Sequence, residues 1–377
     1  MTDDVPDVRP TWGEVDLGAV RANARRLTAL ADPAALLAVV KADGYGHGAV
    51  PVARAALEAG ASWLGVALVE EGTALRGAGI DAPVLVLSEP PDAAAAVVVD
   101  AGLTPVVYTE SGVEALAKAV ADRAVDDPLP VHLKVDTGMH RVGCAPDDAR
   151  GLVAAVHARP ELRLEGVCTH FAVADEPDRP ETREQLDTFG RLVADLERSG
   201  ARPPIVHAAN SAGLLQFPEA RFDLVRVGIA LYGVAPGPSP TSVTLDPALS
   251  LRARVTYVKT LPAGARLSYG LRYTLERPAR IATVPVGYAD GVPRNLGLRG
   301  GAVLLHGRRY PIAGAVTMDQ LMVDVGDDDV ETGDEVVLLG TQGGETITAE
   351  EWADRLGIIA YEVVTGIGPR VPRRYVG

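Results

Sequence analysis

Short apolar segments rich in β-branched residues recur along the first two-thirds of the chain, and each is followed by a segment with helical spacing. Strands that are apolar on both faces and alternate with helices are typical of a parallel sheet. Eight such units in roughly 200 residues favour a (β/α)8 barrel over a doubly wound sheet, which would explain five or six units better. The predicted strands lie at 36–40, 62–67, 83–87, 104–108, 130–135, 162–168, 204–209 and 222–227, and the clearest helices at 49–60, 110–124 and 183–200.

The pattern changes after a Pro/Ser/Thr-rich connection at 236–247. Beyond it, short apolar runs separated by Gly and Asp predict antiparallel strands, with a hairpin tip at HGRR. Only 348–357 is typical of a helix, with Thr348 as N-cap, Glu351 at the capping-box position and Gly357 as C-cap. The predicted fold is therefore α/β, a TIM-type barrel followed by a C-terminal, mostly antiparallel β domain. We expect the barrel at 13–240, the β domain at 241–377 and an N-terminal segment at 1–12 that associates with the β domain.

Composition narrows the function classes. The 377 residues are 47% hydrophobic, which is enough for a large core and excludes intrinsic disorder. The net charge of −14 disfavours nucleic acid and anionic membranes as partners. Two cysteines, Cys144 and Cys168, and an acidic N-terminus without a signal-peptide pattern favour a cytoplasmic protein. No group of His, Asp and Glu has the spacing of a metal site, so no metal is expected.

Polar residues and glycines follow the predicted strands, at the end where barrel enzymes place their active sites. They include Lys41, Lys134, Arg141, His170, Asn210, Ser211, Arg226, Gly228 and Ile229. Together, a lysine, a second Lys/Arg pair, an Asn-Ser step and a Gly-Ile helix start suit an anionic phosphate and a carbonyl group.

Each of these residues also has a structural interpretation. By position alone, Lys41 is better explained as a strand-end lysine that extends to water. His170 and His207 fit hydrogen-bonded core histidines. Lys134 fits an ion pair with Asp136 or another surface carboxylate, and Arg226 fits one with Asp223.

The segment VVKADGYGHG at 39–48 resembles the cofactor-lysine motif of the alanine racemase family, which are pyridoxal-phosphate enzymes of the barrel type. The resemblance continues in the same order over almost the whole chain. It includes the segments at 11–23, 132–143, 169–176, 207–213, 223–233, 267–274, 284–291 and 316–325.

The resemblance implies two catalytic bases. Lys41 matches the lysine that forms a Schiff base with pyridoxal phosphate and serves as one base. Tyr269, in LSYGLRYT, matches the second base, and racemisation requires proton transfer on both faces of a planar carbanion. Cationic or hydrogen-bonding neighbours must activate that phenol, and His170, His207 and Arg226 are the candidates.

The remaining roles are also implied by the resemblance. Arg226 matches the residue that faces the pyridine nitrogen, and the cofactor-binding residues are Tyr45, His170, Asn210, Ser211, Gly228 and Ile229. The substrate-binding residues are Arg141, Tyr288, Met318 and Asp319, and Lys134 matches a lysine that is often carbamylated. Active sites in the family combine the barrel of one subunit with the β domain of the other, so the resemblance implies a homodimer with shared sites.

The implied activity is interconversion of L- and D-alanine, which supplies D-alanine for peptidoglycan. A serine or broad-specificity racemase of the same fold is the alternative, because Pro369 stands where many members have a tyrosine that helps to hold the phosphate and narrow the pocket. Thr317 and His140 also depart from the usual cysteine and glycine. A decarboxylase fits less well because Arg226 replaces the expected acidic partner, and a non-catalytic pyridoxal-phosphate carrier would lack Tyr269 and the β domain.

Overall fold

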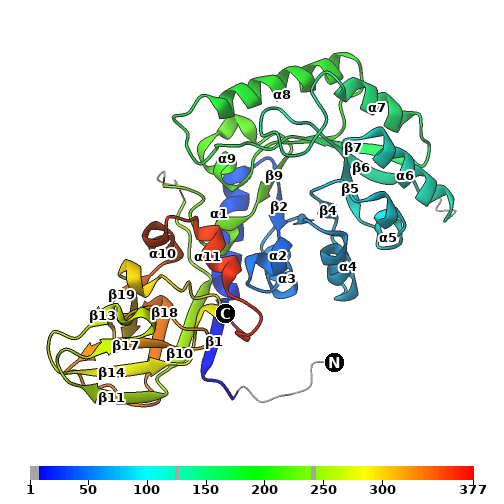
Figure 1. Cartoon of the computed structure of the whole chain (residues 1–377). Coiled ribbons are helices and arrows are strands. Elements are labelled where there is room, and N and C mark those ends of the chain that lie inside the picture. Colours follow the sequence, from blue (N-terminus) through cyan, green and yellow to red (C-terminus); the bar gives the residue numbers. More distant parts are fainter. Residues whose placement is uncertain (1–7, 124–126, 239–242) are drawn as a thin grey trace. The chain divides into compact units, whose positions relative to one another are not determined.

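The computed structural model describes residues 8–123, 127–238 and 243–377. These residues pack into two compact units (Figure 1). The barrel unit contains 20–44 and the described residues of 49–246, and the β unit contains 8–19, 45–48 and 247–377. Because these units group residues by packing, the predicted domain bounds at 1–12, 13–240 and 241–377 stay a prediction.

Eight parallel strands form the sheet of the barrel unit, in the order β8-β7-β6-β5-β4-β3-β2-β9. Hydrogen bonds from Asp223 N–H to Val206 O (3.0 Å) and from Arg226 N–H to Ala209 O (2.9 Å) connect the two ends of this order and close it. The predicted barrel is confirmed. Its strands are β2 (Ala35–Val39), β3 (Trp63–Val66), β4 (Val84–Val86), β5 (Thr104–Val107), β6 (Leu129–Lys134), β7 (Leu162–Cys168), β8 (Ile205–His207) and β9 (Leu224–Val227).

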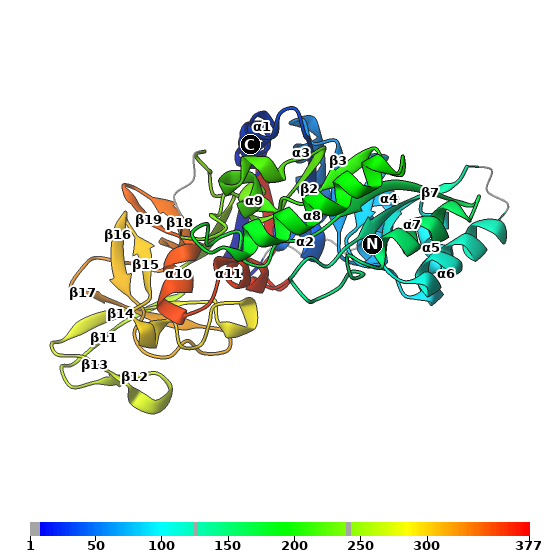
Figure 2. The ribbon, with the colours of Figure 1, turned by 90° about the horizontal axis from the view of Figure 1, so that it is seen from above.

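Helices cover the outside of the sheet, as Figure 2 shows for α5, α6 and α7. The longest, α8, turns Phe189, Leu192, Val193 and Leu196 inward at helical spacing. None of the helices in the described residues is long and apolar enough to cross a membrane. The helices are α1 (Leu17–Ala31), α2 (Lys41–Tyr45), α3 (Ala49–Glu58), α4 (Val69–Gly77), α5 (Ala95–Asp100), α6 (Glu110–Ala121), α7 (Ala149–His157), α8 (Glu181–Arg198) and α9 (Ser211–Gln216).

The β unit contains a seven-stranded, a three-stranded and a two-stranded sheet. All its pairs are antiparallel except β1 with β20, which confirms the mostly antiparallel prediction. Its strands are β1 (Thr11–Asp16), β10 (Leu249–Arg254), β11 (Tyr257–Leu261), β12 (Arg266–Leu267), β13 (Tyr273–Thr274), β14 (Ala279–Val284), β15 (Ala302–Leu305), β16 (Arg308–Pro311), β17 (Leu321–Gly326), β18 (Glu335–Gln342), β19 (Glu345–Ile347) and β20 (Arg373–Val376).

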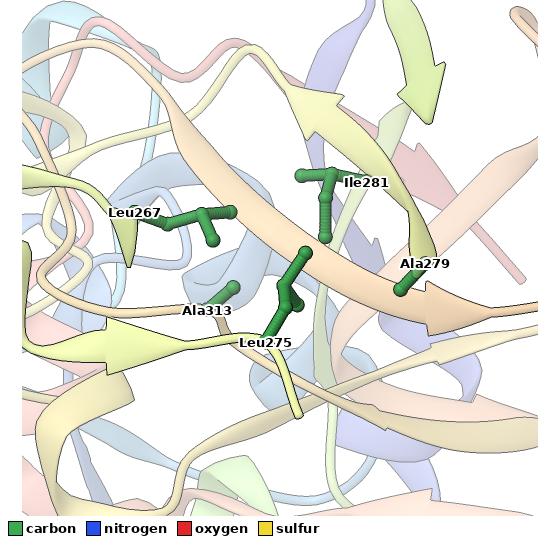
Figure 3. Close-up of a cluster of buried hydrophobic side chains, with 5 residues drawn as sticks. All are labelled: Leu267, Leu275, Ala279, Ile281 and Ala313. Carbon is green, nitrogen blue, oxygen red and sulfur yellow. The ribbon is translucent and has the colours of Figure 1, made fainter. Parts of the chain in front are cut away.

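A small apolar cluster includes Leu267 of β12, the strand that precedes Tyr269. It comprises Leu267, Leu275, Ala279, Ile281 and Ala313, all at most 4% exposed (Figure 3). Burial of these side chains anchors β12 and β13 to the larger three-stranded sheet, because a two-stranded ribbon alone is only marginally stable.

The β15–β16 hairpin turns at His306 and Gly307, whose φ angles are 49° and 73°. Two-residue loops with positive φ at both positions match the twist of the flanking strands, so the predicted hairpin tip is confirmed.

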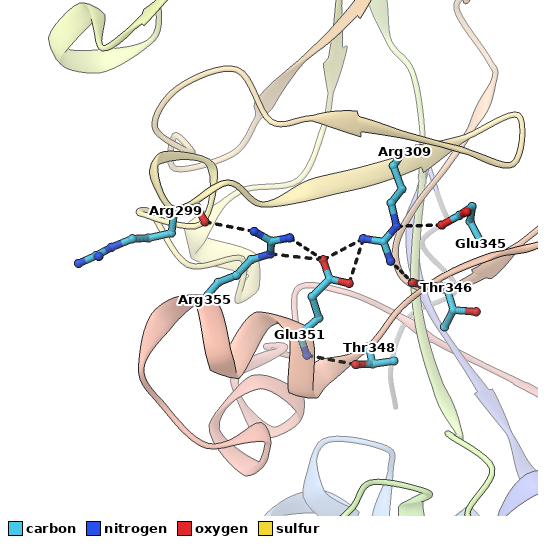
Figure 4. A network of polar contacts seen from close by, with 7 residues as sticks. All are labelled: Arg299, Arg309, Glu345, Thr346, Thr348, Glu351 and Arg355. Atoms are coloured by element: carbon cyan, nitrogen blue, oxygen red, sulfur yellow. Dashed lines mark hydrogen bonds and ion pairs between the residues drawn. The ribbon is translucent and has the colours of Figure 1, made fainter. Parts of the chain in front are cut away.

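Helix α10 (Ala349–Leu356) has the predicted caps, and helix α11 (Ala360–Gly366) follows it. Thr348 Oγ1 accepts a hydrogen bond from Glu351 N–H at 3.1 Å, and Gly357 ends α10 with φ 70°. The expected capping box is not formed, because Arg309 and Arg355 bind the Glu351 carboxylate instead (Figure 4). Two guanidinium groups compete successfully with one backbone N–H for a carboxylate.

Candidate active site

Lys41 lies just beyond the carboxyl end of β2 and begins a short left-handed turn. Ala42 and Asp43 both have φ 51°, and Gly44 has φ 59°. This conformation costs roughly 1–2 kcal/mol for each residue other than glycine. Surrounding contacts must therefore hold the turn that presents the lysine.

Glu71, in the first turn of α4, supplies one such contact. Its Oε1 accepts a hydrogen bond from Ala42 N–H at 2.6 Å, and its Oε2 accepts from Ala67 N–H and Leu68 N–H at 2.8 and 3.1 Å. The sequence interpretation missed Glu71. Its place at the third position of a helix marks a capping carboxylate, but not a contact with a residue 29 positions earlier.

The Lys41 amine lies in a positively charged, partly buried environment. Burial and the neighbouring Arg141 guanidinium lower the pKa of Lys41, and Glu71 opposes this effect. A lowered pKa increases the fraction of neutral amine, the form that can act as nucleophile or base.

Lys134 ends β6 and is 7% exposed. Its Nζ donates to Leu87 O at 2.9 Å. Burial lowers the pKa of Lys134 to about 8, with contributions from Arg226, Arg141 and Lys41, while Cys168 opposes the shift. Its observed contact is thus a backbone carbonyl and not the Asp136 carboxylate, and a pKa of about 8 leaves the amine partly neutral near physiological pH.

Asp136 instead shapes the loop that leads to Arg141. Its Oδ1 accepts three backbone hydrogen bonds at 3.0 Å, from Gly138, Met139 and His140. Although burial opposes the shift, these bonds and the nearby His140 ring lower the pKa of Asp136. The carboxylate fixes the loop in place of a Lys134 partner.

Arg226, on β9, is 5% exposed and has four contacts through Nη1 and Nη2. Nη1 donates to His207 Nδ1 at 2.8 Å, and Nη2 donates to Thr169 O, Ala208 O and His170 Nδ1 at 2.8, 2.9 and 3.2 Å. Within the described residues its Nε–H has no hydrogen-bond partner.

The alternative pairing of Arg226 with Asp223 is not observed. Asp223 Oδ2 accepts from Arg202 Nη2 and from Val206 N–H, both at 2.8 Å. The charge of the Arg226 guanidinium is therefore not neutralised by Asp223, and it contributes to the positive charge at the carboxyl ends of the barrel strands, which we call the barrel rim.

The two histidines beside Arg226 are neutral. Burial and the Arg226 charge lower the pKa of both His170 and His207 well below the usual value. Since Arg226 can only donate, each histidine receives its hydrogen bond at Nδ1 and carries its single proton on Nε2.

Two short helical starts meet next to this group. Asn210 caps α9 by accepting from Gly213 N–H at 2.8 Å. Ser211 Oγ accepts from Gly228 N–H at 2.9 Å and from Ala230 N–H at 3.4 Å, which joins α9 to the 3-10 turn that begins at Ile229. The structure thus brings the barrel-derived candidates together at one rim.

The β unit carries the other predicted residues, and Tyr269 is the most exposed of them at 66%. It begins a 3-10 turn directly after Ser268, which has φ 62° and donates through Oγ to Ala315 O. The hydrogen bond from the Ser268 side chain thus stabilises the unfavourable backbone conformation at which the turn begins.

Tyr288, Met318 and Asp319 lie on adjoining loops of the β unit. Tyr288 N–H donates to Thr317 O at 3.0 Å, and Ala289 N–H donates to Met318 O at the same distance. Asp319 accepts from Arg370 Nη2 at 2.8 Å, a contact that the sequence interpretation missed because 51 residues separate the partners.

Tyr45 also belongs to the β unit, where its ring lies 6.2 Å from that of Tyr361 between centroids. Burial raises the pKa of Tyr45 to about 12, so the phenol stays protonated and can donate a hydrogen bond. The functional roles of all these residues stay predictions.

The chain thus combines a parallel barrel, with a lysine beyond the end of a strand and a cluster of cationic residues, with a mostly antiparallel β unit, and this is the architecture of a two-domain barrel protein. Two family models match the chain in this order, "Alanine racemase, N-terminal domain" over 15–236 and "Alanine racemase, C-terminal domain" over 248–375. The chain belongs to the alanine racemase family.

Individual relatives agree over nearly their whole length. An alanine racemase from Symbiobacterium thermophilum is 52% identical over 99% of both chains. The crystal structure of an alanine racemase from Streptomyces lavendulae superposes with a TM-score of 0.92 at 45% identity, covering 99% of this chain and 98% of that one. A histidine racemase from Leuconostoc mesenteroides superposes with a TM-score of 0.91 at 30% identity, covering 99% of each chain. The fold alone therefore does not fix the amino acid.

Proposed function

We propose that this protein interconverts L- and D-alanine with pyridoxal phosphate and two bases, Lys41 and Tyr269. The observation that carries the proposal is the barrel rim, where an amine of lowered pKa shares its environment with a buried arginine held by two neutral histidines. In a chain of this family, that arrangement fits an anionic cofactor whose ring nitrogen accepts a hydrogen bond.

The residues of the barrel unit fit pyridoxal phosphate. Arg226 keeps Nε–H as a donor that no other group in the described part of the chain occupies. Lys41 would bind the aldehyde carbon, and Ser211, Gly228 and Ile229 would hold the phosphate, with His170 and Asn210 as further cofactor contacts. The family resemblance adds Tyr45, which ends the turn that Lys41 begins. When bound, pyridoxal phosphate supplies an electron-withdrawing ring that acidifies the Cα–H bond of an attached amino acid.

Arg226 would limit how strongly the cofactor ring withdraws electrons. A guanidinium stays protonated and has no acceptor atom, so it leaves the ring nitrogen without a proton. We expect this to weaken electron withdrawal and to suppress side reactions such as transamination. His170 and His207 maintain the donor by accepting from it rather than competing with it.

Lys41 and Tyr269 transfer the protons. On one face of the substrate, the neutral Lys41 amine removes the proton from Cα or returns it as the ammonium. On the opposite face, the Tyr269 phenol donates a proton to Cα or removes one as the phenolate. A free phenol titrates near 10, so Tyr269 must be covered and hydrogen-bonded before it can act.

The exposure of Tyr269 supports a homodimer with shared sites. A side chain that is 66% exposed in the single chain lacks the dry environment that proton transfer at carbon requires. The partner's barrel would supply that environment, and the sites would then combine two chains. A cytoplasmic location and a supply of D-alanine for peptidoglycan complete the proposal.

In the proposed dimer, the substrate carboxylate has candidate partners in the barrel unit of one chain and in the β unit of the other. Arg141 supplies a guanidinium on the barrel side, and Met318 supplies a backbone N–H that donates no hydrogen bond to another described residue. Tyr288 and Asp319 would line the entry. The low pKa of Lys134 favours carbamylation, since only a neutral amine adds carbon dioxide, and a carbamate would orient Arg141.

A serine or broad-specificity racemase is the second candidate. Pro369 favours it, because proline has neither a hydroxyl to hold the phosphate nor the bulk of the usual tyrosine. Steady-state rates on alanine, serine and lysine distinguish the two. A non-catalytic carrier would bind the cofactor but leave every amino acid unracemised.

The proposal is tested by following deuterium incorporation at Cα of each alanine enantiomer in deuterated water. Lys41→Ala and Tyr269→Phe should each reduce racemisation by about 10²–10⁴-fold, with unequal effects on the two enantiomers. Lys118→Ala and Tyr257→Phe, which change an exposed lysine and an exposed tyrosine, are the controls. Equal exchange of both enantiomers in either active-site variant would contradict two bases on opposite faces.

A further inference from the structure

Inside the barrel unit, Arg226 is the first residue of a series of polar contacts that leads to His207, His132 and Glu165. His207 Nε2 lies 2.8 Å from His132 Nδ1, and His132 Nε2 lies 3.5 Å from Glu165 Oε2. Both histidines are 0% exposed. We call Arg226, His207, His132 and Glu165 the barrel row.

The contact between His132 Nε2 and Glu165 Oε2 is longer than a normal hydrogen bond, but no other described polar group forms a shorter one with either atom. In the described ranges of the chain, His132 Nε2 and Glu165 Oε2 are buried, and neither has a hydrogen bond of normal length to any group. Leaving a buried donor or acceptor unpaired costs about 1–3 kcal/mol. At 3.5 Å, each of these two atoms is the nearest group able to offset that cost for the other.

The chemistry of arginine sets the direction of every contact. Arg226 has no acceptor, so it donates to His207 Nδ1, and the neutral His207 must carry its proton on Nε2. That proton is donated to His132 Nδ1. Burial lowers the pKa of His132 too, so its proton lies on Nε2 and faces Glu165.

Glu165 is charged at the end of the row. Burial alone would raise the pKa of its carboxyl, but the interaction with His132 and the Arg163 guanidinium together outweigh burial and lower the pKa. Glu165 Oε1 also accepts from Arg163 Nη2 at 3.1 Å. The row therefore runs from a cation at the rim, through two neutral imidazoles, to an anion.

The backbone makes room for this arrangement at Gly166. The register pairs His132 on β6 with Gly166 on β7, and Cys168 on β7 with His207 on β8. A Cβ at Gly166 would lie 2.5 Å from His132 Nδ1. Gly166 therefore lets the His132 ring cross β7 and reach His207, and Glu165 beside it supplies the acceptor.

We infer that Glu165, acting through His132 and His207, is a positioning residue for Arg226. Its carboxylate holds both imidazoles in the tautomer that turns His207 Nδ1 toward the guanidinium. Without that acceptor, His132 can move its proton to Nδ1, which then faces the Nε2–H of His207, and the contact between His207 and Arg226 loosens. The inferred tautomers do not depend on the proposed function, whereas the expected effect on kcat rests on it.

The tautomers can be measured directly. In the full-length protein with bound pyridoxal phosphate and ¹⁵N-labelled histidine, two-bond ¹H–¹⁵N spectra should place the proton of His132 and His207 on Nε2. Glu165→Leu should shift or split both sets of signals. Glu165→Gln keeps an acceptor oxygen and should preserve them, and Glu114→Gln, on the exposed surface of α6, should change nothing. Unchanged tautomers in Glu165→Leu would overturn the inference.

A second variant covers the case in which Glu165→Leu does not fold. His132→Leu keeps the volume and removes both contacts of that ring, so the His207 signals alone should shift to a mixture of tautomers. His207 signals that stay as in the wild type overturn the inference.

Activity gives an independent readout. The kcat of Glu165→Leu should fall about tenfold, equivalent to about 1.4 kcal/mol, with little change in KM, and Glu165→Gln should recover most of it. A kcat of Glu165→Leu equal to the wild-type value would overturn the positioning role. A wild-type protein that racemises no amino acid would refute the proposed function, while the spectra still decide the tautomers.

Discussion

Glu71 Oε1 lies 2.6 Å from Ala42 N, so a carboxylate from α4 directly holds the turn that presents Lys41. The same side chain caps its own helix and acts against the depression of the pKa of Lys41. Glu71 thus both stabilises the left-handed turn and raises the fraction of protonated Lys41 amine.

Replacing Glu71 should loosen that turn. Glu71→Ala removes an acceptor for three backbone N–H groups, and charge-assisted bonds of this kind contribute about 1.5–3 kcal/mol. We expect the free energy of unfolding in urea to fall by that order. Glu70→Ala, its exposed neighbour in the same helical turn, is the matched control. Equal decreases in the free energy of unfolding of the two variants would show that Glu71 contributes only what any acidic residue contributes in the first turn of a helix.

Lys134 should make stability depend on alkaline pH. Its pKa is about 8 in the folded protein and near the ordinary 10.5 when unfolded. Between these values the unfolded chain binds more protons, so the wild type should become more stable with rising pH, by at most about 1.4 kcal/mol per pH unit. Below pH 8 both states are protonated and the contribution is constant.

The measurement compares the free energy of unfolding of the wild type with that of Lys134→Met from pH 7 to 10. The difference should move in favour of the wild type above pH 8. Lys118→Met, at an exposed lysine on α6, gives the background. A difference that does not change over this range would contradict the low pKa or indicate that the amine is carbamylated, which ¹³C-labelled bicarbonate would reveal.

The cap of α10 should contribute measurably to the β unit. Thr348→Ala removes the acceptor for Glu351 N–H and should lower the free energy of unfolding by about 1 kcal/mol. Thr348→Ser keeps the hydroxyl and should stay within a few tenths of the wild type. A similar loss in both variants would assign the effect to the threonine methyl group instead.

The sequence predicted the barrel because its strands are buried on both faces and therefore form unbroken apolar runs in chain order. The hairpin at His306 and the caps of α10 followed from local turn and capping chemistry. These features depend on neighbours along the chain, which a single sequence displays.

Contacts across strands or between distant loops could not be predicted in this way. His132, Glu165 and His207 lie on three different strands, and their pairing depends on a register that Gly166 permits. Glu351 fails as a capping-box residue because Arg309, 42 residues away, competes for it. Tyr269 was predicted only through the family resemblance, since no spacing marks an exposed tyrosine as a base.

In the proposed homodimer, Lys41 of one chain and Tyr269 of the other form one site. Coexpression of Lys41→Ala and Tyr269→Phe chains with different affinity tags yields a heterodimer in which one site lacks both bases and the other has both. This heterodimer should recover about half of the wild-type rate per dimer, although each parent homodimer is nearly inactive. A heterodimer as inactive as its parents would contradict the shared site, because both bases of a site would then come from the same chain.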